Sequence, residues 1–253
     1  MIEFQVRGRA ALITINRPEA RNAINGVVAS GLQEAVERLE ADDELWAGII
    51  AGQGPVFSAG ADLKEIAAGN VARLVTKPGG FGGITRLERR KPLIAAVDGP
   101  ALAGGCELVC TCDLVVASTA ASFGIPEVKR SLVAGAGGLF RLPRVLPRNV
   151  AMELAITGDP ITAERAYALG LVNVLCEPGA AVEYALALAE RICVNAPVAV
   201  QLSRSIVLDG MLADDAEAWR ITDAATRSVM ETEDFSEGPK AFIEKREPVW
   251  TGR

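Results

Sequence analysis

The sequence predicts an α/β fold in which short buried strands alternate with helices, followed by a region made of helices alone. Continuous apolar runs of strand length, such as Trp46–Ala51 and Pro92–Val97, are typical of strands covered on both faces. Between them, Ser30–Leu39 places its apolar residues at the spacing of an amphipathic helix. Strands that alternate with helices favour a parallel sheet joined by crossover connections. From about Ala180 onward, helical patterns follow one another without a strand.

The individual elements follow from the same two patterns, taken in chain order. Short apolar runs predict strands at Ala10–Asn16, Trp46–Ala51, Pro92–Val97, Leu114–Ala117 and Leu171–Leu175, with an extended piece at Ser122–Glu127. Helical spacing predicts helices at Ser30–Leu39, Ile84–Arg90, Ala151–Thr157, Ala163–Leu169, Ala181–Cys193, Val198–Leu208, Asp214–Met230 and Pro239–Glu247, and a further helix beginning at Leu63.

Two glycine-rich stretches interrupt this alternation. Gly69–Gly83 is the least regular part of the chain, and we expect it to be a mobile segment or lid. Val133–Leu142 is expected to be a loop that enters a helix, which Pro143 then stops. No linker divides the chain, so we expect one compact unit made of a core (residues 1–179) and a helical C-terminal region (residues 180–253).

Composition and charge bound the function. The chain has 253 residues, of which 50% are hydrophobic and 23% charged, as is ordinary for a soluble globular protein. A net charge of −6 argues against nucleic acid as a partner. No stretch approaches the ~20 apolar residues that span a bilayer. The first residues carry charges and lack the apolar segment of a signal peptide, so we expect a cytoplasmic protein.

The chain contains no histidine, and this absence narrows its chemistry. It removes nucleophile pairs that depend on histidine and the usual zinc sites. Proton transfer near neutral pH then falls mainly to carboxylates. The five cysteines have no metal-ligand spacing and are interpreted as small buried hydrophobic residues in a reducing compartment.

The stretch Ala101–Asp113 (ALAGGCELVCTCD) is the first candidate site. Small residues at its start let the backbone approach another segment or a ligand closely. If Gly104 and Gly105 open a helix, Glu107 lies in its first turn, beside N–H groups without an intrahelical partner. Burial would raise the pKa of Glu107 and those N–H groups would lower it, so the sequence leaves the balance open.

A second glycine loop, Ser58–Asp62 (SAGAD), follows the apolar run that ends at Ala51. Such a turn can present the N–H of Ala61 to a ligand, but taken alone it is better interpreted as a tight connection with Asp62 as a helix cap. For Gly104, a functional N–H and close packing are equally good interpretations. Ligands gather at the carboxyl ends of parallel strands, so both loops could face one pocket and bind a thioester oxygen.

The candidate acid and base are Glu107 and Glu127. Glu127 alone could equally be a solvated surface residue, whereas the apolar surroundings of Glu107 favour a function. Two carboxylates on opposite sides of a bound water would form an acid/base pair without histidine. The run Gly135–Gly138 does not match a dinucleotide-binding pattern, and we interpret it as a helix start that packs under Glu127.

Four segments carry a resemblance to a known family. They are FSAGADLKEI (Phe57–Ile66), IAAVDGPALAGGCELVCTCDLVVAS (Ile94–Ser118), FGIPEVKRSLVAGAGGLFRLPR (Phe123–Arg144) and TGDPITAERAYALGLVN (Thr157–Asn173). In this order they identify the chain as similar to the crotonase, or enoyl-CoA hydratase/isomerase, superfamily over nearly its whole length. The resemblance implies a spiral of ββα units with a helical C-terminal trimerisation region, and a homotrimer or a hexamer formed by two trimers.

The resemblance also implies an activity and the residues that perform it. It implies an acyl-CoA thioester substrate of lipid metabolism and no metal or redox cofactor, coenzyme A being part of the substrate. The matching positions place the oxyanion-hole N–H groups on Ala61 and Gly104 and the catalytic carboxylates on Glu107 and Glu127. Those that match the coenzyme A site are Arg21, Ala23, Ile24, Ala59, Asp62, Leu63 and Lys64.

Because both glutamates are present, the resemblance favours an enoyl-CoA hydratase, which adds water to a 2-trans-enoyl-CoA to give a 3-hydroxyacyl-CoA. Three alternatives stay open. An enoyl-CoA isomerase needs only one carboxylate. A specialised dehydratase is suggested because residues 81–92 and 141–147 resemble the carnitinyl-CoA dehydratase branch. A non-catalytic acyl-CoA-binding protein would not require two glutamates in an apolar setting.

Overall fold

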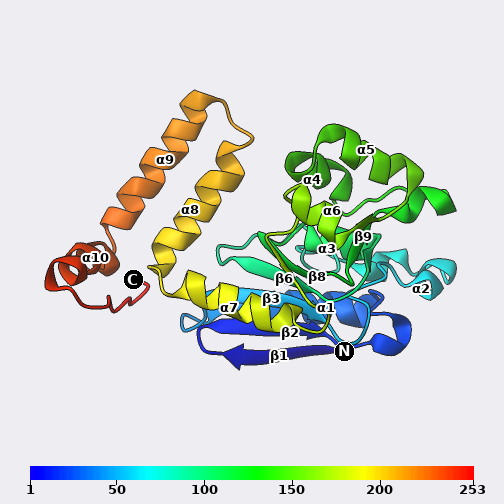
Figure 1. Cartoon of the computed structure of the whole chain (residues 1–253), viewed down its shortest axis with the longest axis horizontal. Helices are drawn as coiled ribbons and strands as arrows, with labels where there is room; N and C mark the ends of the chain where they lie inside the picture. Colours follow the sequence, from blue (N-terminus) through cyan, green and yellow to red (C-terminus); the bar gives the residue numbers. More distant parts are fainter.

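A mixed six-stranded sheet forms the centre of the molecule in the computed structural model, which describes all 253 residues (Figure 1). The strand order is β1-β2-β3-β6-β8-β11. β1 pairs antiparallel with β2, and every other neighbouring pair is parallel. The strands are β1 (Ile2–Arg7), β2 (Ala10–Ile15), β3 (Ala47–Gly52), β6 (Leu93–Val97), β8 (Leu114–Ser118) and β11 (Val174–Cys176). The predicted parallel α/β core is therefore confirmed.

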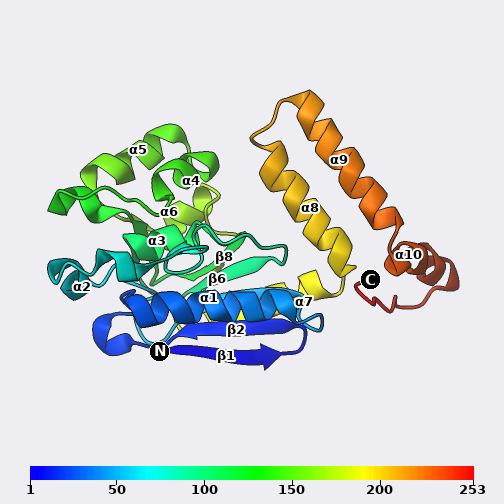
Figure 2. The same cartoon turned by 180° about the vertical axis from the view of Figure 1, so that it is seen from behind.

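Helices cover both faces of this sheet, which explains why its strands read as continuous apolar runs. α1 (Gly26–Ala41) lies on one face and α7 (Ala181–Cys193) on the other, as Figures 1 and 2 show from opposite sides. Successive residues of one strand alternate between the two cores. In β2, Ala11 and Ile13 pack with α1, whereas Ala10 and Leu12 pack with α7.

A smaller sheet lies beyond the carboxyl ends of the main strands and supports the site. Its order is β10-β9-β7, where β7 (Ala101–Leu102) pairs parallel with β9 (Ser122–Gly124) and β9 pairs antiparallel with β10 (Ile161–Thr162). The short pair β4 (Val75–Thr76) and β5 (Gly80–Phe81) is separate. The surrounding helices are α2 (Leu63–Ala67), α3 (Gly104–Val109), α4 (Gly138–Val145), α5 (Arg148–Thr157) and α6 (Ala163–Ala168), with 3₁₀ helices η1 (Pro18–Ala20), η2 (Val71–Leu74) and η3 (Pro126–Arg130).

The C-terminal region is helical, as predicted. α8 (Pro197–Gly210) and α9 (Asp215–Met230) pack side by side and project away from the sheet. α9 runs back toward the start of α8, where α10 (Glu233–Glu244) follows (Figures 1 and 2). An ion pair fastens α8 to the core, because Arg204 Nε lies 2.8 Å from Asp113 Oδ1 and Asp113 Oδ2 lies 2.6 Å from Arg89 Nη1. No single helix has the length and hydropathy to cross a membrane; only α7 and α8 taken together do, and they are bent by 106°.

Two helices have other ends than the sequence predicted, because each of them contains a proline in its interior. Pro143 lies inside α4, and Pro239 lies inside α10, which spans Glu233–Glu244 instead of Pro239–Glu247. A helical proline leaves the carbonyl of the residue four positions earlier without its N–H partner. That residue is Leu139 in α4 and Phe235 in α10, and both are exposed residues at the surface of the molecule.

Other predicted elements were wrong or were missed. Residues 84–90 form turns instead of a helix, because Thr85 and Arg89 bond to distant segments. The strand expected from Leu171 begins only at Val174. β1 was not predicted, since it is mostly exposed and takes its backbone hydrogen bonds from β2.

Candidate active site

A cavity of about 500 Å³ brings together the four residues that the sequence singled out, Ala61, Gly104, Glu107 and Glu127. Ala61 lies in the loop before α2, and Gly104 is the first residue of α3. Glu107 lies in the first turn of α3, and Glu127 lies in η3. Apolar side chains form much of the remaining wall, including Ile66, Leu74, Phe81, Leu102, Leu132 and Val133. The expectation that the two glycine loops face one pocket is confirmed.

The two loops lie against each other because glycines permit it. Ser58 and Ala101 form a parallel bridge in which Leu102 N–H donates to the Ser58 carbonyl at 3.0 Å. A Cβ atom added to Gly60, whose φ is +86°, would lie 2.7 Å from the Gly104 nitrogen. A Cβ added to Gly105 would collide with the Ser58 carbonyl oxygen. The close backbone approach predicted from the small residues is therefore present, and only glycine fits it.

The N–H groups of Ala61 and Gly104 have no acceptor within the protein. Ala61 forms a parallel bridge with Ile24, whose N–H donates to the Gly60 carbonyl and whose carbonyl accepts from the Asp62 N–H. The N–H of Ala61 therefore points away from Ile24. Gly104 is the first residue of α3, whose opening N–H groups lack intrahelical partners. Ala103 before it has φ 52° and ψ −131°, an uncommon conformation for a residue with a side chain. Two unpartnered N–H groups on one cavity can bind an oxyanion.

Phe81 is a site residue that the sequence analysis missed. Its ring packs directly on Gly104, where an added Cβ would collide with ring atoms Cε1 and Cζ. Phe81 belongs to β5 in the irregular segment that was expected to be a lid. No local pattern connects it with Gly104, because the contact depends on how β5 folds over α3.

Glu107 is 2% exposed, and its carboxylate is held by the backbone of another element. Oε1 accepts hydrogen bonds from Ala136 N–H at 2.8 Å and Gly138 N–H at 2.9 Å. The prediction that Glu107 lies in the first turn of a helix opened by Gly104 and Gly105 is confirmed. The expected N–H donors from its own helix are wrong, because the carboxylate takes its donors from Ala136 and Gly138. Burial raises the pKa of Glu107, while the N–H groups of Gly138 and Ala136 and the charge of Arg141 oppose that rise.

The glycine run 135–138 was expected to pack under Glu127. In the structure it packs on Glu107 instead. A Cβ added to Gly138 would lie 2.9 Å from Glu107 Cγ, so this position needs a glycine to admit the carboxylate. Gly137 has φ +106°, which also favours glycine. The run is a cradle for a carboxylate, and we call residues 136–138 the Glu107 cradle.

Glu127 has the opposite environment within the same cavity. It lies in η3, and its Oε2 is buried without any hydrogen-bond partner. Burial raises the pKa of Glu127 to about 7, and the negative charge of Glu107 adds to the rise. The backbone N–H of Glu127 itself and the charge of Arg130 oppose it. A carboxyl group that titrates near neutral pH is suited to proton transfer.

The residues expected to bind coenzyme A divide into two groups. Arg21, Ala59 and Leu63 line the cavity. Ala23, Ile24, Asp62 and Lys64 do not line it, and all of these but Lys64 are buried. The contacts of both groups with coenzyme A remain a prediction.

Asp62 and Asn22 fix the loops on this side. Asp62 accepts from Lys64 N–H at 2.9 Å and pairs with Arg17 Nη1 at 2.6 Å, which confirms its interpretation as the cap of α2. Asn22 is fully buried and donates to the carbonyls of Gln53 and Val56 at 2.9 and 2.7 Å. Its left-handed φ of 53° and that of Arg21 turn the chain toward the cavity.

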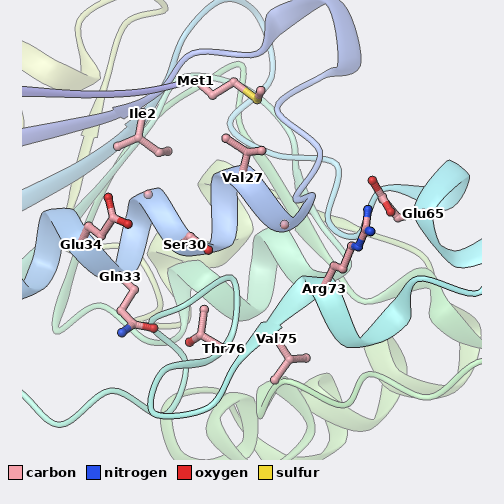
Figure 3. A pocket seen from close by; sticks show the side chains of 12 residues that line it. Met1, Ile2, Val27, Ser30, Gln33, Glu34, Glu65, Arg73, Val75 and Thr76 are labelled. Atoms are coloured by element: carbon pink, nitrogen blue, oxygen red, sulfur yellow. The ribbon is translucent and has the colours of Figure 1, made fainter.

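The segment 69–83 separates the candidate site from a second cavity. Val71, Leu74 and Val75 line the site, while Arg73, Val75 and Thr76 line a cavity of about 980 Å³ with α1 on its far side (Figure 3). None of the predicted site residues lines this second cavity. The motion expected of this segment remains a prediction.

The cysteines are all free thiols, of which Cys106 and Cys176 are buried and Cys110, Cys112 and Cys193 are partly buried. The prediction of buried small residues is therefore confirmed for two of them. No group of three or more histidine, cysteine, aspartate or glutamate side chains could hold a metal ion.

Comparison with known proteins shows what the whole chain is similar to. The model of the family described as enoyl-CoA hydratase/isomerase matches residues 6–253. The carnitinyl-CoA dehydratase of Salmonella heidelberg is 39% identical over 247 residues, covering 95% of this chain and 94% of that protein. The structure of an enoyl-CoA hydratase from Mycobacterium tuberculosis is 47% identical with a TM-score of 0.96, covering 100% of this chain and 99% of the other. A carnitinyl-CoA hydratase structure from Mycobacterium avium is 48% identical with a TM-score of 0.80, covering 100% and 98%.

Proposed function

This chain belongs to the enoyl-CoA hydratase/isomerase family, and we propose that it reversibly adds water to a 2-trans-enoyl-CoA to give a 3-hydroxyacyl-CoA. The observation that carries the proposal is the pair of unpartnered N–H groups, of Ala61 and Gly104, on the cavity that also holds Glu107 and Glu127. A thioester oxygen between these donors would be stabilised as negative charge develops on it. Donors of this kind are each worth about 3–4 kcal/mol where one has been removed.

The different environments of the two carboxyl groups suggest their roles. Glu107, held by two N–H donors, is proposed to accept a proton from water as the water oxygen bonds to Cβ of the substrate. The π electrons of the enoyl group move to the thioester oxygen and form an enolate. Glu127, whose pKa is raised to about 7, then gives its proton to Cα, and the C–S bond stays intact. The reverse sequence is the dehydration of a 3-hydroxyacyl-CoA, and neither direction calls for a metal or redox cofactor.

A second candidate is a dehydratase for a specialised acyl-CoA. The curated relatives at 38–39% identity are named carnitinyl-CoA dehydratases, which favours this class. The same residues would serve, because dehydration is the reverse of hydration. The isomerase is less favoured, since one carboxylate is enough to move a proton between two carbons. A protein that only bound acyl-CoA would have no need for the unpartnered Oε2 of Glu127.

A substrate panel tests these alternatives directly. We expect the purified protein to consume 2-enoyl-CoAs, followed as loss of the conjugated thioester absorbance, at rates that differ between straight and branched acyl groups. The panel includes the dehydrated form of carnitinyl-CoA and a 3-enoyl-CoA. Turnover of the 3-enoyl-CoA alone would identify an isomerase. Tight binding of acyl-CoAs without any turnover would support the non-catalytic alternative and overturn the proposed reaction.

We also propose that the chain assembles as a homotrimer or as a hexamer of two trimers. The C-terminal region supports this, because its helices and the turn between α8 and α9 expose large apolar side chains such as Leu212 (65%), Trp219 (68%) and Phe242 (85%). Exposed apolar surface on projecting helices is typical of an interface. Light scattering after size-exclusion chromatography measures the mass, and a monomer at micromolar concentration would contradict the proposal.

A further inference from the structure

Arg141 lies behind the Glu107 cradle and touches it directly. Its Nη1 donates to the Ala136 carbonyl at 3.0 Å, and the N–H of that same residue donates to Glu107 Oε1 at 2.8 Å. The guanidinium also crowds Gly137, where an added Cβ would collide with Nη1. The central residue of the cradle must therefore be a glycine for Arg141 to occupy its place.

The other end of the guanidinium reaches the oxyanion-hole side of the site. Nη2 of Arg141 donates to the Thr85 carbonyl at 2.7 Å. Thr85 in turn donates through its hydroxyl to the Phe81 carbonyl at 3.1 Å. Phe81 is the residue whose ring packs on Gly104. One side chain thus connects the loop that holds the Glu107 carboxylate with the turn that covers the Gly104 donor.

Arg141 has no carboxylate partner for its charge. Both of its hydrogen bonds go to neutral carbonyl oxygens, although its side chain is partly buried. A cation removed from water without a counter-ion is costly, so a merely structural role would be served better by a neutral side chain. Its positive charge does act on Glu107, where it opposes the rise in pKa caused by burial.

The other groups around Glu107 do not replace this charge. Glu127 on η3 carries the same sign as Glu107, and Arg130 beside it acts on Glu127. The Cys106 thiol on the same helix is neutral, because its hydrogen bond to Cys110 and its burial raise its pKa well above the usual value. Arg141 is the cation whose charge acts on Glu107.

We propose that Arg141 is a positioning residue that keeps Glu107 ionised and aligned and holds Phe81 against Gly104. Arg141 does not line the cavity, so it acts through these other groups and not on the substrate. The kinetic consequences rest on the proposed hydration, whereas the effect on the Glu107 carboxylate does not.

The first test measures Glu107 without any substrate. The protein labelled with ¹³C at the glutamate carboxyl carbons is titrated by NMR, with Glu107→Gln to assign the signal. In Arg141→Gln the titration of Glu107 should move to higher pH, and in Arg141→Lys, which retains the charge, it should move less. The matched control is Arg144→Gln, because Arg144 is an exposed cation of the same helix and lies 5.0 Å from the same Phe140 ring as Arg141 does. A titration of Glu107 unchanged in folded Arg141→Gln would overturn the proposal.

The second test follows hydration of crotonyl-CoA and the panel substrates. Arg141→Gln should lower kcat by about 10²-fold with little change in KM, because a misplaced catalytic group costs this much. The acidic limb of its pH profile should move to higher pH, and Arg141→Lys should recover part of kcat. If the variant only contained less active protein, kcat would fall by the same factor at every pH and the acidic limb would not move. That result counts against the proposal. If the wild type hydrates none of the substrates, the proposed function fails, while the NMR titration still decides the role of Arg141.

Discussion

Two carboxyl groups share one cavity in this protein, and their surroundings are opposite. Glu107 is almost fully buried and anchored by two backbone N–H groups, from the loop before α4 and from the first residue of α4. Glu127 sits in a short 3₁₀ helix with one oxygen buried and unpartnered. The difference teaches that the fold itself assigns roles to identical side chains. Burial raises the pKa of both groups, but the N–H donors of the cradle oppose the rise at Glu107, whereas the charge of Glu107 adds to the rise at Glu127.

The comparison also gives a physical basis for the proposed acid/base pair near neutral pH without histidine. Two close carboxylates resist being ionised together, so one proton is shared between the pair. The Glu107 cradle biases that proton toward Glu127, whose pKa is raised to about 7. An acid and a base are then available at the same pH, from one residue type.

The largest effect is expected from removing the acid. Glu127→Gln should lower kcat for enoyl-CoA hydration by about 10³-fold or more, because the proton for Cα is lost. The limb of the pH profile near 7 should disappear in this variant, since hydration needs Glu127 protonated and slows as the pH rises through its pKa. Steady-state kinetics between pH 5 and about 9 measure both.

The same experiment on Glu107→Gln separates the two roles. This variant should lose the acidic limb and keep a basic limb, because Glu127 is still present. That limb should move to lower pH, since the charge of Glu107 no longer adds to the rise in the pKa of Glu127. Circular dichroism confirms that both variants are folded. Wild-type turnover in Glu127→Gln would refute the two-carboxylate mechanism.

A smaller effect is expected from disturbing the cradle. Gly138→Ala places a methyl group 2.9 Å from Glu107 Cγ, and the displaced carboxylate should lower kcat by about 10²-fold. When Glu107→Gln is already present, Gly138→Ala should lower kcat by a much smaller factor, since both substitutions disrupt the same interaction. Additive losses in the double variant would show that the cradle does not act through Glu107.

The smallest effect is on stability. A carboxyl group whose pKa rises on folding binds its proton more tightly in the native state, so the native state loses stability as the pH rises from about 4.5 to 7. Glu127→Gln has no carboxyl group to ionise and does not lose this stability. Its free energy of unfolding at pH 8 should exceed that of the wild type by about 2 kcal/mol. This is less than the value that the full pKa shift gives, because the side chain is only partly buried. Urea unfolding at pH 5 and pH 8 checks the sign, and equal differences at both would contradict it.

The sequence was a good guide wherever local pattern decides structure. The apolar runs that became β2, β3, β6 and β8, and the helical spacing of α1 and α7, are confirmed because both faces of the sheet are covered. The segment 84–90 shows the limit, since its helical spacing gave way to the bonds that Thr85 and Arg89 make with distant groups.

The sequence by itself predicted which residues carry chemistry. The SAGAD and AGGCE loops, two glutamates and the absence of histidine predicted a carboxylate site with backbone donors, and the structure places these residues on one cavity. Only the tertiary structure decided which donors serve Glu107, because Ala136 and Gly138 lie about 30 positions away along the chain, at separations of 29 and 31. It also decided that Phe81 covers Gly104 and that Arg141 connects the two halves of the site. Local spacing encodes secondary structure, whereas the surroundings of a buried charge depend on which segments the fold brings together.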